Sequence, residues 1–159
     1  MMFLAARAVA YSSLFVGLVL IVLPARLLTA AGIARPQAIG PWQVAGLLVG
    51  LAGAAIALWC ILTFVIVGRG TPAPFDPPRR LVVRGPYRVV RNPMYLGAGI
   101  AVAGAALFYQ SVVLLGYVGL FWLAMHVFVI AYEEPTLRRM FGPEYSTYCQ
   151  NVGRWWPGQ

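Results

Sequence analysis

The chain has 159 residues, of which 61% are hydrophobic and only 10% are charged. A composition this apolar leaves too little polar surface to cover a soluble domain, so it indicates a protein of the lipid bilayer. The formal net charge of +8 comes from arginine without any lysine, and these arginines flank apolar segments. The charge therefore points to anionic lipid headgroups and membrane topology, and excludes a separate basic domain for nucleic acid.

The first apolar segment, Met2 to Leu23, carries a single charge, Arg7, near its start. It is too long for the apolar part of a signal peptide, and no small-residue cleavage site follows it. We expect Pro24 and Arg26 to end it. The sequence thus predicts a retained first span, followed by a loop or interfacial turn over residues 27–41.

The second segment, Trp42 to Val67, has no charged residue. At about 1.5 Å per residue it is longer than a hydrocarbon core of roughly 30 Å requires, so we expect the helix to tilt. Small residues recur in it at helical spacing, a pattern that lets membrane helices approach closely. They are Gly46, Gly50 and Gly53.

Two cysteines, Cys60 and Cys149, lie far apart in the sequence. Their separation gives no metal-ligand spacing, and buried thiols of this kind are usually inert. The sequence therefore predicts no metal site.

The first long polar stretch covers residues 68–92. Thr71 to Pro78 contains four prolines, so we expect it to run extended along the surface. The densest group of polar side chains follows from Arg84 to Tyr95, with the sequence RGPYRVVRNPMY. A helix can begin at Pro93, with Asn92 as its N-cap.

The third apolar segment, Met94 to Tyr109, is short for a span and resumes two residues later as Val112 to Tyr132. One helix of the combined length would far exceed a bilayer, so we predict a tight antiparallel helical hairpin. We expect a face of small residues on its first arm to pack against the second arm. This face consists of Gly97, Ala101 and Ala105.

After Tyr132 the chain becomes polar. Apolar side chains there repeat at helical offsets, opposite charged ones, which predicts an interfacial amphipathic helix interrupted near residues 142–143. Trp155 and Trp156 suit the headgroup boundary. The apolar set is Leu137, Met140, Phe141, Tyr145 and Tyr148, and the charged set is Arg138, Arg139 and Glu144.

Four spans place the amino terminus, the 68–92 loop and the tail on one side of the membrane. That side carries all the arginines except Arg26 and Arg35, so the positive-inside rule makes it cytoplasmic. The sequence thus predicts an all-α polytopic protein of a bacterial inner membrane, with two helices in residues 1–67 and the functional core in residues 68–159. The glycine faces fit packing within one chain or between two, so the oligomeric state stays open.

Two motifs flank the hairpin: RGPYRVVRNPMYLG begins at Arg84, and EEPTLRRMFGPEYSTYCQNVGRW begins at Glu133. Over roughly residues 79 to 157, this pair resembles the carboxy-terminal core of the isoprenylcysteine carboxyl methyltransferase family and its bacterial and phospholipid methyltransferase relatives. The resemblance implies an integral membrane enzyme that uses S-adenosylmethionine without a Rossmann domain. The chain has no glycine-rich strand-to-helix fingerprint of that domain.

The resemblance also implies which residues contact the cofactor. A carboxylate, an ammonium, a sulfonium and an adenine call for amide or cationic donors, a carboxylate and aromatic walls, which these residues supply. An in-line displacement at the sulfonium methyl depends on positioning and on exclusion of water, and needs no nucleophilic residue. The implied contacts are Arg79, Arg80, Leu81, Val82, Tyr87, Asn92, Pro93, Met94, Tyr95 and Glu133, and the candidate catalytic residues are Arg91, Asn92 and His126.

Several of these residues have a second interpretation. His126 lies two helical turns before the glutamate pair, where it either orients or deprotonates an acceptor or hydrogen-bonds a neighbouring helix. Glu134 fits a plain charge at the cytosolic end of the span. Arg154 either pins the tail over the site or contacts headgroups. Tyr87 and Tyr95 are alternatively residues of the interfacial aromatic belt.

Two positions depart from the family pattern and leave the acceptor open. The family turn usually reads Arg-His-Pro, whereas Asn92 cannot titrate. In the eukaryotic prenylcysteine enzymes an arginine one helical turn before the matching glutamate faces the substrate, and here that position is Val129. The leading hypothesis is methyl transfer to a small lipophilic carboxylate or thiol that enters from the bilayer. The alternatives are a phospholipid N-methyltransferase and a non-catalytic membrane scaffold.

Overall fold

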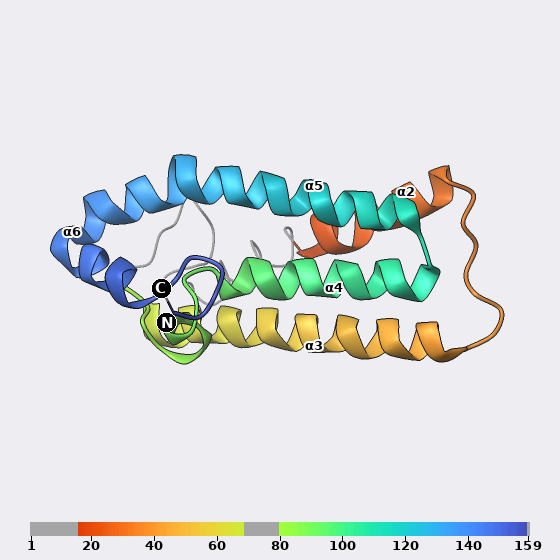
Figure 1. Ribbon diagram of the computed structural model, residues 1–159, viewed down its shortest axis with the longest axis horizontal. Coiled ribbons are helices and arrows are strands. Elements are labelled where there is room, and N and C mark those ends of the chain that lie inside the picture. Colours follow the sequence, from red (N-terminus) through yellow and green to blue (C-terminus); the bar gives the residue numbers. More distant parts are fainter. Residues whose placement is uncertain (1–15, 69–79, 159) are drawn as a thin grey trace.

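The computed structural model describes residues 16–68 and 80–158, and these residues form helices without a β-strand. Figure 1 shows α4 (Pro93–Tyr109) lying between α3 (Pro41–Thr63) and α5 (Val112–Phe128). The short α2 (Leu23–Ala30) lies at one end of this layer, and α6 (Glu134–Asn151) continues from α5 at the other end. The predicted all-helical membrane architecture is confirmed.

The amino-terminal helix runs past the point at which the sequence predicts a stop. A π-helical segment, η1 (Val16–Val22), leads directly into α2. Pro24 lies at the junction where the helix changes from π-helical to α-helical, and the helix continues past it to Ala30. The predicted ends at Pro24 and Arg26 were therefore wrong, and the loop occupies only residues 31–40. Residues 2–15 of the predicted span lie outside the described part of the chain.

The predicted second span is confirmed in its position. It begins at Pro41, and η2 (Phe64–Gly68), a π-helical turn, extends it beyond α3. Residues 41–67 form an apolar helix that is long enough to cross a membrane. The proline-rich segment predicted to be extended, Thr71 to Pro78, lies outside the described residues.

The backbones of α3 and α4 are in direct contact through small residues. A Cβ atom added to Gly46 would lie 2.5 Å from the backbone nitrogen of Phe108, and one added to Gly97 would lie 2.7 Å from that of Ala57. The prediction that the glycines of α3 mediate close packing is confirmed.

The expected partner was wrong for Gly97 and Ala101 of the small face on α4, because these two residues face α3 and not α5. The third member, Ala105, packs in the cluster of Leu28 and Leu114, which belong to α2 and α5. The two faces match because both helices carry small residues at helical spacing, so their backbones can meet. On the side of α4 that faces α5, the small residue at the contact is Gly99. A Cβ atom there would lie 2.7 Å from Nε1 of Trp122, so Gly99 makes room for the indole of α5.

The helical hairpin is confirmed. Gln110 ends α4 in the left-handed region, with φ of 49°, and Ser111 begins α5 as its N-cap. The Ser111 hydroxyl accepts a hydrogen bond of 3.2 Å from the backbone N–H of Leu114. The turn therefore needs only two residues.

The second arm of the hairpin is longer than a bilayer is thick. From α5 the helix passes through the π-helical turn η4 (Val129–Glu133) into α6, 40 residues in all. Residues 112–141 precede the bend at Gly142, and at about 1.5 Å per residue they extend roughly 45 Å, more than a hydrocarbon core of about 30 Å, so we expect α5 to cross the bilayer and α6 to lie beyond it.

The predicted interruption of the terminal helix is confirmed at Gly142, whose φ of 49° bends α6 before Pro143. Tyr145 and Tyr148 form the buried face with other members of the predicted apolar set. Met140 does not belong to that face, because it is 46% exposed.

Candidate active site

The two polar motifs meet at one end of the helical layer. Figure 1 shows the start of α4, the end of α3, the α5–α6 junction and the carboxy terminus gathered there. Because the hairpin returns the chain to the end from which α4 begins, residues before α4 and after α5 can form one site.

A hydrogen bond joins the two motifs directly. The Tyr95 hydroxyl donates to Oε2 of Glu133 at 3.1 Å, although the residues are 38 positions apart. Tyr95 lies in the first turn of α4 with only 8% of its surface exposed, and Glu133 is the last residue of η4. Within the described residues Glu133 forms no ion pair. The partner of this carboxylate in the described part of the chain is thus a neutral hydroxyl.

Tyr87 lies beside this pair on a short 3₁₀ helix, η3 (Gly85–Arg88). Its ring meets Phe64 edge to face at 5.1 Å between centroids, and it packs against Cys60. Burial raises the pKa of the Tyr87 hydroxyl well above its ordinary value, and the neighbouring Cys60, Glu133 and Tyr95 raise it further. Tyr87 is therefore a neutral hydroxyl close to Glu133.

Gly85 makes the tight approach of this turn possible. Its φ is +58°, and an added Cβ atom would lie 3.3 Å from Oγ1 of Thr63 and 3.4 Å from Nε1 of Trp59. Only glycine combines that backbone conformation with so little space. The turn therefore lies directly on the end of α3.

Glu134 forms a buried ion pair network with two arginines. Arg154 donates to it through Nε at 2.6 Å and through Nη2 at 3.0 Å, and Nη1 of Arg91 lies 3.1 Å from the same carboxylate. Burial alone raises the pKa of Glu134, but the Arg154 hydrogen bonds and the charges of Arg91 and Arg154 outweigh it, so the pKa lies below its ordinary value of 4.5. The interpretation of Glu134 as a plain charge at the end of the span was wrong.

Further contacts attach the tail to the turn before α4. The backbone N–H of Arg91 donates to the carbonyl of Gly153 at 2.9 Å, and its Nη1 donates to Sγ of Cys149 at 2.8 Å. Asn92 stands at the N-cap position as predicted, but its side chain donates to the carbonyl of Arg154 at 3.2 Å and does not cap the helix. Of the two interpretations of Arg154, pinning of the tail is the one that the structure shows.

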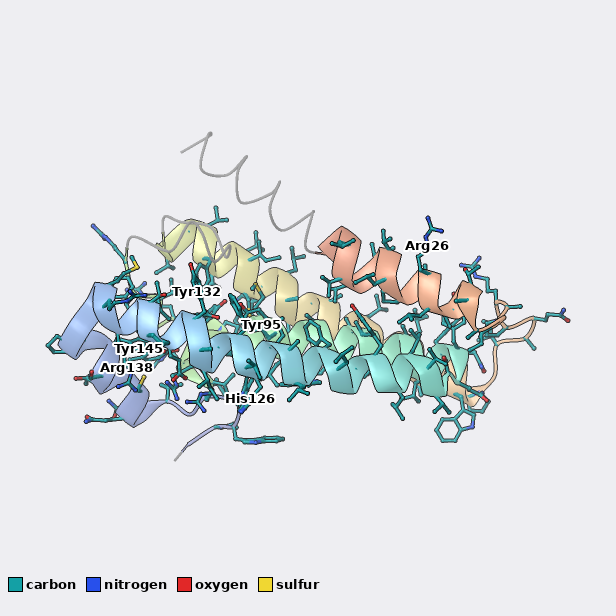
Figure 2. The ribbon with its side chains drawn as sticks, turned by 90° about the horizontal axis from the view of Figure 1, so that it is seen from above. Arg26, Tyr95, His126, Tyr132, Arg138 and Tyr145 are labelled. Carbon is teal, nitrogen blue, oxygen red and sulfur yellow. The ribbon has the colours of Figure 1, made fainter. Side chains whose placement is uncertain are left out.

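The aromatic tail folds back onto α5. Nε1 of Trp155 donates to Nδ1 of His126 at 3.0 Å, and the Trp155 ring lies 5.2 Å from that of Trp122. In Figure 2, His126 points away from α5 on the opposite side from Tyr95. The π-helical turn after His126 has an i→i+5 repeat, so the spacing of two α-helical turns does not keep His126 and Glu133 on one face. Trp156 is 79% exposed.

The remaining predicted contacts lie around the Tyr87 turn. Val82 and Met94 belong to the cluster of Cys60 and Tyr87, and Leu81 packs against the buried tyrosines of α6. Pro93 is buried, Arg80 is exposed, and Arg79 lies outside the described residues. Across 16–68 and 80–158, no group of three His, Cys, Asp or Glu side chains is placed to hold a metal ion.

A model of the phospholipid methyltransferase family matches residues 42–144, more than half of the chain. The chain belongs to the phospholipid methyltransferase family. The matched region runs from α3 into α6 and contains Tyr87, Tyr95 and the glutamate pair. The resemblance found in the sequence is thereby confirmed, and this family indicates a membrane methyltransferase.

This member of the family is also similar to a curated protein, the nickel-cobalt-cadmium resistance protein NccN of Alcaligenes xylosoxydans xylosoxydans. The two are 31% identical over 121 residues, which cover 73% of this chain and 52% of the relative. The chain thus spans about half the length of that relative. No solved structure matches the chain.

Sequence reasoning missed several contacts of this methyltransferase-family site, among them two that join its parts directly. One is the Glu134 network, and the other is the Tyr148 hydroxyl, which donates to the carbonyl of Tyr87 at 2.7 Å. A signal for the first was present, since a glutamate pair and an arginine both occur in the second motif. Which glutamate faces the arginine depends on helix rotation around η4, which the sequence does not reveal.

Proposed function

We propose that this chain is an integral membrane methyltransferase that takes its methyl group from S-adenosylmethionine and transfers it to a small lipophilic carboxylate or thiol. The observation that carries the proposal is the hydrogen bond between Tyr95 and Glu133. It brings the two family motifs together at one end of the hairpin.

The residues at this end suit the charged methyl donor. Glu133 offers a carboxylate to its ammonium or sulfonium, and the rings of Tyr87 and Tyr95 offer π-faces to cationic or aromatic groups. The N-terminus of α4 after Asn92 offers a positive dipole end to its carboxylate. The proposed contacts remain Arg79, Arg80, Leu81, Val82, Tyr87, Asn92, Pro93, Met94, Tyr95 and Glu133.

S-adenosylmethionine would supply an activated methyl group, so the protein's part is to bind, orient and exclude water. Tyr87 and Tyr95 are buried, which suits a site from which water is excluded. Neither Asn92 nor the neutral Tyr87 hydroxyl supplies a base at neutral pH. Proton transfer is therefore not the protein's main contribution in this proposal.

The structure gives Arg91 and His126, the candidate catalytic residues from the sequence, other hydrogen-bond partners, so the proposal assigns them no catalytic step. Arg91 is engaged with Glu134 and Cys149, and His126 accepts its hydrogen bond from the tail.

We propose that the cofactor enters from the cytoplasm of a bacterial cell and that the acceptor enters from the inner membrane between the helices.

A second candidate is transfer to the amine of an ethanolamine phospholipid. The family is described as phospholipid methyltransferases, so membership of this family supports the second candidate as well as the first. The two candidates differ in the acceptor atom and share the cofactor site. A scaffold without catalytic activity is the outcome if neither reaction occurs.

Calorimetry of purified protein in detergent tests the cofactor site. We expect saturable binding of S-adenosylmethionine that Glu133→Ala abolishes. The matched control is Glu144→Ala, since Glu144 is an exposed carboxylate on α6 and should be dispensable. Folded wild-type protein that binds no cofactor would refute the proposal and favour the scaffold.

A transfer assay with methyl-labelled cofactor separates the acceptors. Lipophilic carboxylates, lipophilic thiols and phosphatidylethanolamine are each presented in mixed micelles. Label in the first two classes supports the leading candidate, and label in phosphatidylethanolamine supports the second.

A further inference from the structure

We infer that Glu134 is a positioning residue of this site, which fastens residues 153–156 against the turn 91–95 and thereby holds Tyr95 in place toward Glu133. The inference rests on the proposed function. It assigns two different tasks to two neighbouring glutamates.

The two carboxylates diverge because adjacent helical residues point in directions about 100° apart. Glu133 meets the hydroxyl of Tyr95, whereas Glu134 meets the guanidinium groups of Arg91 and Arg154. The first carboxylate thus has no cationic partner in the described part of the chain, and the charge of the second is compensated. Of the two glutamates, Glu133 is therefore the one whose described neighbours do not already compensate a carboxylate charge.

Glu134 is connected to the turn before α4 by a short series of contacts. Its carboxylate grips Arg154 with two hydrogen bonds, and the carbonyl of Arg154 accepts the side-chain N–H of Asn92. The neighbouring carbonyl, that of Gly153, accepts the backbone N–H of Arg91. Tyr95 follows Asn92 by three residues in the same first turn of α4.

Burial makes these contacts interdependent. Glu134 is only 7% exposed, and removal of its charge would leave the guanidinium of Arg91 without its carboxylate partner. A buried polar network that loses one member is destabilised as a unit. We therefore expect the turn and the tail to loosen together.

The tail has a second attachment that does not depend on Glu134. Trp155 contacts Trp122 and His126 of α5. Loss of the Glu134 charge should therefore displace the turn without releasing the whole tail. The expected consequence is weaker cofactor binding by folded protein.

The test compares Glu134→Gln with the matched control Glu144→Gln by calorimetric titration of S-adenosylmethionine in detergent. We expect Glu134→Gln to raise Kd at least tenfold while the binding stoichiometry stays near that of the wild type, and Glu144→Gln to change neither. If Glu134 only stabilised the fold, Glu134→Gln would instead reduce the fraction of protein that binds cofactor and leave the Kd of that fraction unchanged. That result overturns the inference.

A second variant covers the case in which Glu134→Gln does not fold. Arg154→Lys keeps the positive charge but loses the two-pronged contact, and Arg139→Lys on the exposed face of α6 is its control. We expect Arg154→Lys to raise Kd about fivefold or more while the binding stoichiometry stays near that of the wild type. A wild-type Kd, or a reduced stoichiometry with an unchanged Kd, would overturn the inference.

Cofactor binding by the wild type distinguishes failure of the proposed function from failure of the positioning role. If folded wild-type protein binds no S-adenosylmethionine, the proposed function fails and this inference fails with it. If the wild type binds and the Arg154 and Glu134 variants bind equally well, the positioning role alone is wrong.

Discussion

At the scale of single residues, the site depends on small differences between chemically similar side chains. Glu133 and Glu134 are adjacent in the sequence, yet one accepts a tyrosine hydroxyl and the other two guanidinium groups. Their positions at the end of the span were predictable from the sequence. Their partners were not, because the π-helical turn η4 sets the rotation of the helix at this point.

Replacement of Tyr95 by phenylalanine should weaken cofactor binding without unfolding the protein. The hydroxyl orients the Glu133 carboxylate, and a hydrogen bond to a charged group contributes about 1.5–3 kcal/mol. We expect Kd for S-adenosylmethionine to rise by about 10-fold or more, since about 1.4 kcal/mol corresponds to a factor of ten. Calorimetry measures it, with Tyr109→Phe at the far end of α4 as the control, and an unchanged Kd would show that the contact is not needed.

The Glu134 network gives stability a defined pH dependence. The pKa of Glu134 in the folded protein lies below its ordinary value of 4.5. The network therefore contributes its full stabilisation of the fold above about pH 4.5, and this contribution is lost as the pH falls through the lower pKa of the folded state. We expect the melting temperature in detergent to fall below about pH 4.5 in the wild type. This part of the fall should be absent in Glu134→Gln, and identical pH profiles of the two proteins would contradict the assignment.

At the scale of helices, the contact between α3 and α4 supports the site. Its glycines bring two backbones together, and α4 begins with the turn that carries Asn92 and Tyr95. The glycine pattern of α3 could be interpreted from the sequence because small residues at helical spacing have a known effect on packing. The partner of Gly97 was misassigned, because a sequence shows that a face is small without showing which helix covers it.

Replacement of Gly104 by valine should disrupt this contact. An added Cβ atom at Gly104 would meet the backbone of Gly50, and backbone atoms cannot move aside as a flexible side chain can. We expect a loss of about 1–3 kcal/mol or more of stability, measured by thermal unfolding in detergent. Gly119→Val on the open face of α5 is the control, because a Cβ atom there meets nothing within 4 Å. Equal effects of the two substitutions would argue against a special α3–α4 interface.

At the scale of the whole molecule, the hairpin determines which parts of the sequence meet. A two-residue turn between α4 and α5 was predictable from the lengths of the apolar segments and the polar residues between them. The helical continuation through Pro24 was not, since a proline usually ends a helix and the π-helical segment before Pro24 is not visible in the sequence. The tail contacts also escaped prediction, because they join side chains and backbone groups of segments that lie far apart in the sequence.

The proposed topology places the loop 31–40 and α6 on opposite sides of the membrane. Because the chain has no lysine, one introduced lysine is its only side-chain amine. We expect a membrane-impermeant amine reagent applied to intact cells to label Gln37→Lys and to leave Ser146→Lys unlabelled until the cells are opened. Labelling of both variants in intact cells, or of Ser146→Lys alone, would refute the cytoplasmic site.

Ultraviolet cross-linking of methyl-labelled S-adenosylmethionine to the purified protein tests most directly whether the two motifs form one cofactor site. Peptide sequencing by mass spectrometry then locates the label. We expect it near Tyr87 or Tyr95 and near Glu133, with loss from both places in Glu133→Ala. Absence of specific label, or label confined to residues 16–40, would contradict a cofactor site at this end of the hairpin.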